Sequence, residues 1–268
     1  MKKVITSTQN SYIKEIFQLI EKSRIRRKTQ KFVIEGFREI SLALKGHYII
    51  ETILVDPSIL KGGISEEILL KNPTIEIIEI SNDVYKKLAF RNTTEGIIAL
   101  ANTKSLELNK LNFKTKNPLI LVAEAPEKPG NIGALLRTAD AAGIDAVLIA
   151  NPKTDIYNPN IIRSSVGCVF TTQIATGTTE EIIDFLKNHK INIYGAALTA
   201  SVEYQTIDYT LPTAIIVGTE ATGLSDSWLK NTTKNIIIPM RGAIDSMNVS
   251  VSAAIILFEG VRQRHLKK

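Results

Sequence analysis

The stretch PGNIGALLRTADAAGIDAVLIA, which begins at residue 129, has the residue types of a functional loop followed by a helix and a strand. Its helical part carries apolar residues at the i, i+3, i+4, i+7 spacing of a buried stripe: Ile132, Leu135, Leu136 and Ala139. Arg137 lies beside that stripe, behind a glycine-rich start. This arginine is either an ordinary surface charge or a cation placed over a site.

Glycine and small polar residues also gather in GTEATGLS and in MRGAIDSMNVS, and both segments directly follow predicted strands. Ligands of open α/β sheets bind at the carboxyl ends of the strands. We therefore expect these two loops, together with EAPEKPGNIG before the helix, to form the functional site.

The segment GTEATGLS is close to a phosphate-binding loop but departs from it in two ways. Gly218 and Gly223 have the required spacing, and Ser225 occupies the Ser/Thr position. Leu224 replaces the lysine that would reach the phosphates, and Glu220 adds a charge that would repel a triphosphate. No G-x-G-x-x-G follows a predicted strand, which disfavours a dinucleotide. The loop better suits a cofactor that is neutral, zwitterionic or partly cationic.

The segment MRGAIDSMNVS leads into the last predicted helix. We expect its buried stripe to consist of Met247, Val251, Ala254, Ile255 and Phe258. Ser246 and Asn248 lie where either side chain could cap free backbone amides. Capping explains one of them but not three polar residues at alternate positions, the third being Ser250. A ligand contact is therefore a second interpretation of this segment.

Other kinds of chemistry have little support in the sequence. The three histidines, His47, His189 and His265, are scattered and show neither zinc-ligand spacing nor a nucleophile elbow. Cys168 stands alone in an apolar context and is expected to be an inert buried thiol. With no internal disulfide possible, a reducing cytoplasm is the expected setting. No secretory signal and no membrane span are expected, because long apolar runs are missing.

The positive charge is concentrated near the start of the chain. The net charge is +6, yet the first 45 residues hold eleven Lys or Arg and four Glu. Six of these cations lie in KSRIRRKTQK, which we expect to be a loop. A charge run is usually just a solvated surface, but this one stands in an otherwise balanced protein. It favours a polyanion partner, nucleic acid first.

Two α/β domains are predicted. Residues 1–104 alternate short helices, among them SEEILLK at 65–71, with strands such as FVIEG, and the polar stretch 105–117 is expected to be a linker. Residues 118–268 alternate apolar strands, VFTTQIA among them, with helices. This second pattern predicts a mainly parallel sheet covered on both faces.

Taken in order, the three loops resemble the signature motifs of the SpoU-type (TrmH-like) RNA ribose 2′-O-methyltransferases of the SPOUT superfamily. NIGALLRTADAAG is similar to the first motif of the family, IIVGTEATGLS to the second and IPMRGAIDSMNVSVSAA to the third. IIRSSVG, with Arg163, Ser165 and Gly167, matches a stretch between the first two. Met247 departs from the leucine usual in the family, an apolar exchange that should be tolerated.

The first domain, through FVIEGFREI, resembles the small ribosomal-protein-like RNA-binding domain that many of these enzymes carry. The resemblance implies an α/β fold with a C-terminal trefoil-knotted methyltransferase domain, a rare exception to unknotted topology. It also implies a homodimer with the active site near the subunit interface, and S-adenosylmethionine as methyl donor without a metal.

The resemblance also implies roles for individual residues. The catalytic group would be Arg137, Asn131, Glu220, Ser246 and Asn248. The cofactor contacts would be Leu198, Gly218, Ile238 and Met247. Apart from the resemblance, the charge run predicts RNA phosphate contacts; with the nearby Arg38 these would be Arg24, Arg26, Arg27, Lys28 and Arg38.

The implied reaction is methylation of a ribose 2′-hydroxyl, with ribosomal RNA favoured over tRNA. The family's motif makes Arg137 the catalytic residue. Because a free guanidinium stays protonated to roughly pH 12, we prefer it as a cation that holds a phosphate and stabilises the developing alkoxide. Proton removal through water or through a transiently neutral Arg137 remains open. Two rival interpretations remain. One is a non-catalytic RNA-binding protein of the same fold, and the other is a methyltransferase of the same fold that acts on a base or on tRNA.

Overall fold

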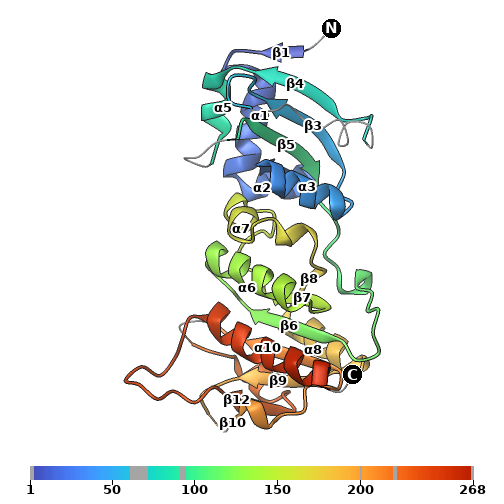
Figure 1. Cartoon of the computed structure of the whole chain (residues 1–268), viewed down its shortest axis with the longest axis vertical. Coiled ribbons are helices and arrows are strands. Elements are labelled where there is room, and N and C mark those ends of the chain that lie inside the picture. Colours follow the sequence, from blue (N-terminus) through green and yellow to red (C-terminus); the bar gives the residue numbers. More distant parts are fainter. Residues whose placement is uncertain (1–2, 61–71, 91–94, 200, 220–221, 267–268) are drawn as a thin grey trace. The chain divides into compact units, whose positions relative to one another are not determined.

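The computed structural model describes residues 3–60, 72–90, 95–199, 201–219 and 222–266. It divides into two compact units (Figure 1). Unit 1 consists of Met1–Lys104 together with Asp155–Thr171, and unit 2 of Ser105–Thr154 together with Thr172–Lys268. The predicted helix at residues 65–71 and the predicted catalytic residue Glu220 lie outside the described residues.

Unit 1 is built on a five-stranded sheet in the order β1-β4-β3-β5-β2. Its strands are β1 (Lys3–Ile5), β2 (Lys31–Glu35), β3 (Ile50–Val55), β4 (Glu76–Ile80) and β5 (Ile97–Asn102). Strands β1, β4 and β3 run parallel, whereas β5 is antiparallel to both β3 and β2. Its helices are α1 (Ser11–Glu21), α2 (Ser23–Thr29), α3 (Phe37–Lys45), α5 (Asn82–Leu88) and α7 (Pro159–Ser164).

Alternate side chains of each strand serve the two faces of this sheet. The apolar faces of α1 and α5 cover one face, where Val33 of β2 and Ile98 of β5 are buried. Phe32, next to Val33, is also fully buried, but it packs against other aromatic rings. Both faces of the sheet are therefore covered, which is why β2 and β5 read as nearly continuous apolar runs.

Residues 155–171 pack in unit 1 although they follow the first strands of unit 2 along the chain. The ring of Tyr157 stacks on Phe32 at a centroid distance of 4.5 Å, and Phe170 lies 5.1 Å from Tyr48. Burial raises the pKa of the Tyr48 hydroxyl far above its usual range. This segment carries the IIRSSVG motif, which the sequence-based division had placed within one continuous second domain.

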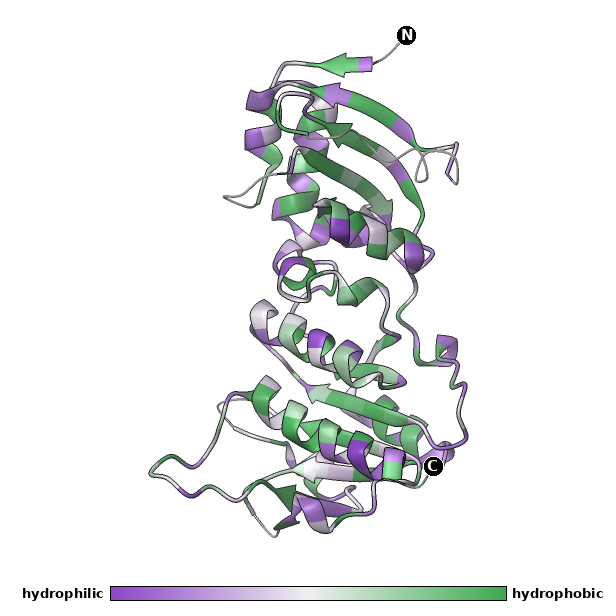
Figure 2. Cartoon of the chain, viewed as in Figure 1, coloured by the Kyte–Doolittle hydropathy of each residue, from purple (hydrophilic) through white to green (hydrophobic). Residues whose placement is uncertain are grey.

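Unit 2 is built on a seven-stranded sheet in the order β10-β12-β9-β11-β6-β7-β8, in which every pairing is parallel. Its strands are β6 (Leu119–Glu124), β7 (Ala146–Ala150), β8 (Ile174–Gly177), β9 (Asn192–Ala196), β10 (Ser201–Glu203), β11 (Thr213–Val217) and β12 (Lys234–Ile237). Strands β6, β7 and β11 are buried throughout. Figure 2 shows β6 as hydrophobic along almost its whole length.

Helices cover both faces of this sheet, as the continuous apolar strands require. They are α6 (Pro129–Ala142), α8 (Thr179–Asn188), α9 (Asp226–Leu229) and α10 (Val249–Leu266). Helices α6 and α10 pack against each other, and α8 and α9 share a core with Ile120 and Val122 of β6. The predicted parallel sheet covered on both faces is confirmed. The predicted apolar stripe of α6, which consists of Ile132, Leu135, Leu136 and Ala139, is also buried.

Three local predictions are wrong. The basic segment is not a loop, because Ser23–Thr29 form helix α2. VFTTQIA is not one strand, because Cys168–Phe170 form a 3-10 turn and β8 begins only at Ile174; Cys168 itself is half-buried. In α10 the buried residues are Ala253, Ile256, Leu257 and Gly260. Val251 and Phe258, expected inside, are 47% and 46% exposed. The first half of α10 is apolar on most sides, so helical spacing alone selects no single face.

Candidate active site

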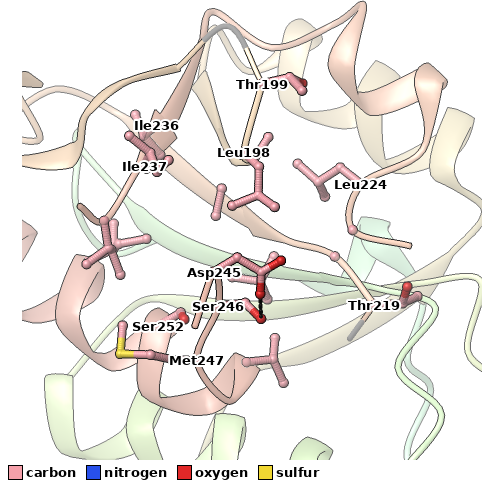
Figure 3. Close-up of a pocket in the computed structure, with 18 of the residues that line it drawn as sticks. Leu198, Thr199, Thr219, Leu224, Ile236, Ile237, Asp245, Ser246, Met247 and Ser252 are labelled. Carbon is pink, nitrogen blue, oxygen red and sulfur yellow. Dashed lines mark hydrogen bonds between the residues drawn. The ribbon is translucent and has the colours of Figure 1, made fainter. Parts of the chain in front are cut away.

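A cavity of about 720 Å³ opens in unit 2 at the carboxyl ends of β9, β11 and β12 (Figure 3). Its walls are residues 196–199 after β9, 217–219 and 222–224 after β11, and 236–238 with Met240 around the end of β12. Residues 245–249, together with Ser252 and Ile256 of α10, close it. The cavity has the size typical of a site for a small organic ligand, and it lies where the fold places ligands.

The four predicted cofactor contacts, Leu198, Gly218, Ile238 and Met247, all line this one cavity. They come from four separate segments, and Figure 3 shows Leu198 and Met247 among the side chains around the hollow. Leu198 is 62% exposed, which leaves an apolar surface open to a ligand. The structure thus brings together residues that are up to 49 positions apart in sequence.

The loop after β11 approaches itself very closely. A Cβ atom on Gly218 would lie 2.2 Å from the carbonyl carbon of Gly223 and 2.6 Å from the backbone nitrogen of Leu224. Thr219 and Gly223 exchange two backbone hydrogen bonds of 3.1 Å, and Gly223 has φ +68°. Only glycine leaves room for this turn at position 218. The two glycines therefore shape the cavity wall instead of forming a phosphate cradle.

The chemistry of the walls limits what can bind there. Aliphatic side chains such as Leu224, Ile236 and Met247 dominate the lining, and Asp245 is the only charged residue among the described residues that form it. Lys and Arg, which bind phosphates, do not occur among those lining residues. The residues present fit a molecule with an apolar ring and a cationic or zwitterionic group, such as S-adenosylmethionine.

Polar side chains meet beside the cavity, at the first turns of α6 and α10. Asn248 Nδ2 donates to Asn131 Oδ1 at 3.4 Å, which links the two helix starts. Asn248 Oδ1 accepts from the backbone nitrogen of Ser250 at 3.0 Å and from its hydroxyl at 2.6 Å. Asn248 therefore caps α10 and also reaches the other helix. Ser246 Oγ donates to Asp245 Oδ1 at 3.2 Å (Figure 3).

Arg137 does not line the cavity of its own chain. It lies on the third turn of α6, opposite the buried stripe, and its side chain is exposed. Asn131 is six residues earlier on α6, which is about 9 Å along the helix axis. Of the predicted catalytic residues within the described ranges, Ser246 and Asn248 line the cavity. Asn131 does not line it but accepts a hydrogen bond from Asn248, and Arg137 lies on the surface.

The predicted RNA contacts divide into exposed and buried residues. Three cations of α2 are exposed, and we call them the α2 cations: Arg24, Arg27 and Lys28. Arg38, in the first turn of α3, is also exposed, as is Arg163 of α7.

Arg26 is a correction to the sequence-based prediction, because it is only 2% exposed. Its guanidinium forms an ion pair with Asp155 and donates to the carbonyl oxygens of Leu19 at 2.6 Å and Ile20 at 3.0 Å. It therefore stabilises unit 1 and does not face a polyanion. The buried partner lies 129 residues away along the chain, so no local pattern distinguishes Arg26 from its neighbours.

Sequence reasoning missed two residues of the site. Asp245 lines the cavity, and the buried carboxylate of Glu124 holds the loop after β11 through the backbone nitrogen of Ser225 at 2.9 Å. The signal for Glu124 was available, since a carboxylate ends a six-residue strand that is otherwise apolar. Within the described residues, no group of three His, Cys, Asp or Glu side chains is arranged to hold a metal ion.

Comparison with known proteins identifies the family. A model of the SpoU rRNA methylase family matches residues 118–258, which is more than half of the chain. The chain belongs to this family. A model of the MRM3-like substrate-binding domain matches residues 10–99, so this member carries the N-terminal domain that the sequence suggested.

Individual relatives extend over both parts of the chain. It is 32% identical over 261 residues to a 23S rRNA (guanosine(2553)-2′-O)-methyltransferase of Bacillus subtilis, covering 96% of this chain and 98% of that one. A crystal structure of an RNA 2′-O ribose methyltransferase has 39% identity and a TM-score of 0.82, covering 98% of this chain and 99% of that chain. An AdoMet-bound rRNA methyltransferase from Sinorhizobium meliloti has 26% identity and a TM-score of 0.87, with 97% of both chains covered.

Proposed function

We propose that this protein methylates a ribose 2′-hydroxyl of 23S ribosomal RNA with S-adenosylmethionine as donor. The observation that carries the proposal is the cavity at the ends of β9, β11 and β12. Segments of two of the three motif loops form its walls, the four expected cofactor contacts line it, and its described lining has no basic side chain. The names of the relatives, which act on 23S rRNA and in one case bind AdoMet, support the choice of substrate and donor.

The walls of the cavity suit the two ends of such a donor. The aliphatic residues Leu198, Ile238 and Met247 offer contacts to a flat apolar ring. Asp245 supplies a negative charge for an ammonium or sulfonium group. When bound, S-adenosylmethionine supplies a methyl group that is already activated for displacement.

The chain's own residues then have to orient the alcohol and help it lose its proton. Asn131 and Asn248, joined by a hydrogen bond at the helix starts, are positioned to hold the ribose beside the cavity. Arg137 holds the adjacent phosphate with its planar guanidinium and stabilises the developing alkoxide. Glu220 keeps its expected orienting role as part of this proposal, because its place in the sequence GTEATGLS matches the family motif.

We propose that two copies form a homodimer. Two observations support an interface on the side of α6 and α10. Val251 and Phe258 of α10 are about half exposed although both are large and apolar. Arg137 lies on the surface of α6 and outside its own chain's cavity. A site that includes Arg137 is therefore completed by a second copy.

Unit 1 is proposed as the RNA-binding part. The α2 cations, Arg38 and Arg163 are exposed on it, and phosphate contacts of this kind make RNA affinity dependent on salt. None of the helices that the structure describes is long and apolar enough to cross a membrane. We place the enzyme in the cytoplasm, where its ribosomal substrate lies, and infer the trefoil knot of the family for unit 2.

The proposal is tested by transfer of a radiolabelled methyl group from S-adenosylmethionine to unmodified 23S rRNA and, separately, to tRNA. Alkaline digestion follows, because a 2′-O-methyl group leaves the adjacent linkage uncleaved. Label in resistant dinucleotides of 23S rRNA is the expected result. Label only in tRNA would show that the substrate is tRNA and not 23S rRNA. Label in mononucleotides would mean that a base is methylated. Cofactor binding without transfer to naked RNA or ribosomal particles would favour the non-catalytic RNA-binding rival.

A further inference from the structure

Glu124 is a buried charge that neither the motifs nor the proposed mechanism uses. It ends strand β6, and only 6% of its surface is exposed. No Lys or Arg of the described chain forms an ion pair with it. A buried carboxylate without a cation is costly unless hydrogen bonds compensate for its lost hydration. Its hydrogen-bond partners therefore indicate why the charge is there.

The partners of Glu124 belong to the loop after β11 and to α8. Oε2 accepts from the backbone nitrogen of Ser225 at 2.9 Å. Oε1 accepts from the hydroxyl of Thr179 at 3.4 Å, and Asn151 Nδ2 donates to that same hydroxyl oxygen at 3.0 Å. Thr179 is itself buried. Glu124 is thus the centre of a small polar network below the loop.

The sheet register places Glu124 next to both ends of this loop. Ala123 of β6 pairs with Val217 of β11, so Glu124 lies beside the start of the loop at Gly218. Its side chain reaches Ser225, where the loop ends. The intervening turn is closed by the two hydrogen bonds between Thr219 and Gly223. One carboxylate therefore fixes the far end of the turn relative to the strand from which the turn begins.

The residue before the tethered nitrogen forms part of the cavity wall. Leu224 lines the cavity and is 7% exposed. It also packs against Gly195 of β9, where an added Cβ would lie 2.8 Å from Leu224 Cδ1. Leu224 is packed against Gly195 on one side and faces the cavity on the other, so a shift of Ser225 would move Leu224 into the cavity or off Gly195.

We propose that Glu124 is a positioning residue, whose carboxylate tethers the loop after β11 and so sets the wall of the cofactor cavity. This inference rests on the proposed use of the cavity for S-adenosylmethionine. Three substitutions distinguish the length of the side chain from its charge. Glu124→Ala removes the carboxylate, and Glu124→Gln keeps the length and an acceptor oxygen. Glu124→Asp keeps the charge but is one methylene too short.

A matched control lies at the opposite end of the same strand. Asp145 Oδ2 accepts from the backbone nitrogen of Leu119, the first residue of β6, at 2.7 Å. Asp145→Ala removes a carboxylate-to-backbone hydrogen bond of the same kind, away from the cavity. Any loss of cofactor affinity that comes from general destabilisation of β6 should appear in this variant as well.

Calorimetric titration of the full-length variants with S-adenosylmethionine tests the tether, with steady-state kinetics on 23S rRNA beside it. We expect Glu124→Ala and Glu124→Asp to weaken binding about tenfold, because both lose the hydrogen bond from the backbone nitrogen of Ser225. Their KM for the donor should rise while kcat at saturation stays near the wild-type value. Glu124→Gln and Asp145→Ala should bind within about twofold of wild type.

Equal affinities of Glu124→Asp and wild type would overturn the tether, as would equal losses in Glu124→Ala and Asp145→Ala. If Glu124→Ala does not fold, the comparison of Glu124→Asp with Glu124→Gln decides alone. A wild-type protein that binds no S-adenosylmethionine would overturn the proposed function itself, and this inference with it.

Discussion

The turn that begins at Gly218 makes the sharpest prediction about the cavity. In Gly218→Ala, the new Cβ would lie 2.2 Å from the carbonyl carbon of Gly223, 2.3 Å from its oxygen and 2.6 Å from the nitrogen of Leu224. Carbon atoms in contact are normally about 3.5–4.0 Å apart. The overlap exceeds 1 Å, and the obstructing atoms are backbone, which cannot rotate away as a side chain can.

The turn must therefore open, and the cavity wall moves with it. Overpacking of this kind costs about 1–3 kcal/mol. If this steric cost weakens the free energy of S-adenosylmethionine binding by about 2–3 kcal/mol, the affinity falls roughly 30- to 150-fold. Calorimetric titration measures this loss directly, and circular dichroism checks that the variant is folded.

Two other glycines provide graded controls. An added Cβ on Gly223 meets nothing within 4 Å, but its φ of +68° is strained for alanine, at a cost of about 1–2 kcal/mol. An added Cβ on Gly242 also meets nothing within 4 Å, and no such φ restricts it. We expect affinity to decrease in the order Gly242→Ala, Gly223→Ala, Gly218→Ala. A Gly218→Ala protein that binds as tightly as Gly242→Ala would refute the steric reasoning.

Three further predictions concern charged residues. Arg26→Met leaves Asp155 buried without its cation and should lower the free energy of unfolding by about 3–5 kcal/mol in urea titrations; adding Asp155→Leu should recover part of that loss. Replacing the α2 cations by glutamine should make the plot of the logarithm of the RNA-binding constant against the logarithm of the salt concentration less steep by about 2 for single-stranded RNA. An unchanged slope would show that α2 does not contact the RNA. Arg137→Lys should slow single-turnover methyl transfer at least tenfold, since the planar fork is lost. Donor affinity should stay unchanged, because the proposed partners of Arg137 are the RNA phosphate and the developing alkoxide and not the donor.

The parts of the fold that follow from local pattern were predictable. The stripe of α6 has helical spacing and is buried, and β6, β7 and β11 are apolar throughout because both faces of the sheet are covered. The three glycine-rich loops were expected at strand ends, and the segments after β11 and β12 line the cavity.

The remaining features depend on contacts between distant residues. Arg26 looks like its basic neighbours, and only its pairing with Asp155 buries it. The exposed side of α10 could not be identified either, since Val251 and Phe258 are as apolar as the buried Ile256 and Leu257. Likewise, no periodicity shows that Tyr157 stacks on Phe32.

The membership of residues 155–171 in unit 1 has a consequence for how the protein is made. Unit 1 is discontinuous, so the polypeptide passes from one unit to the other three times, after Lys104, Thr154 and Thr171. During synthesis the N-terminal part cannot gain the Tyr157 and Phe170 rings or the Asp155 carboxylate until Thr171 has left the ribosome. A fragment cut at the polar stretch 105–117 would lack them and leave Arg26 without its counter-charge. The two units of this methyltransferase are therefore expected to mature together.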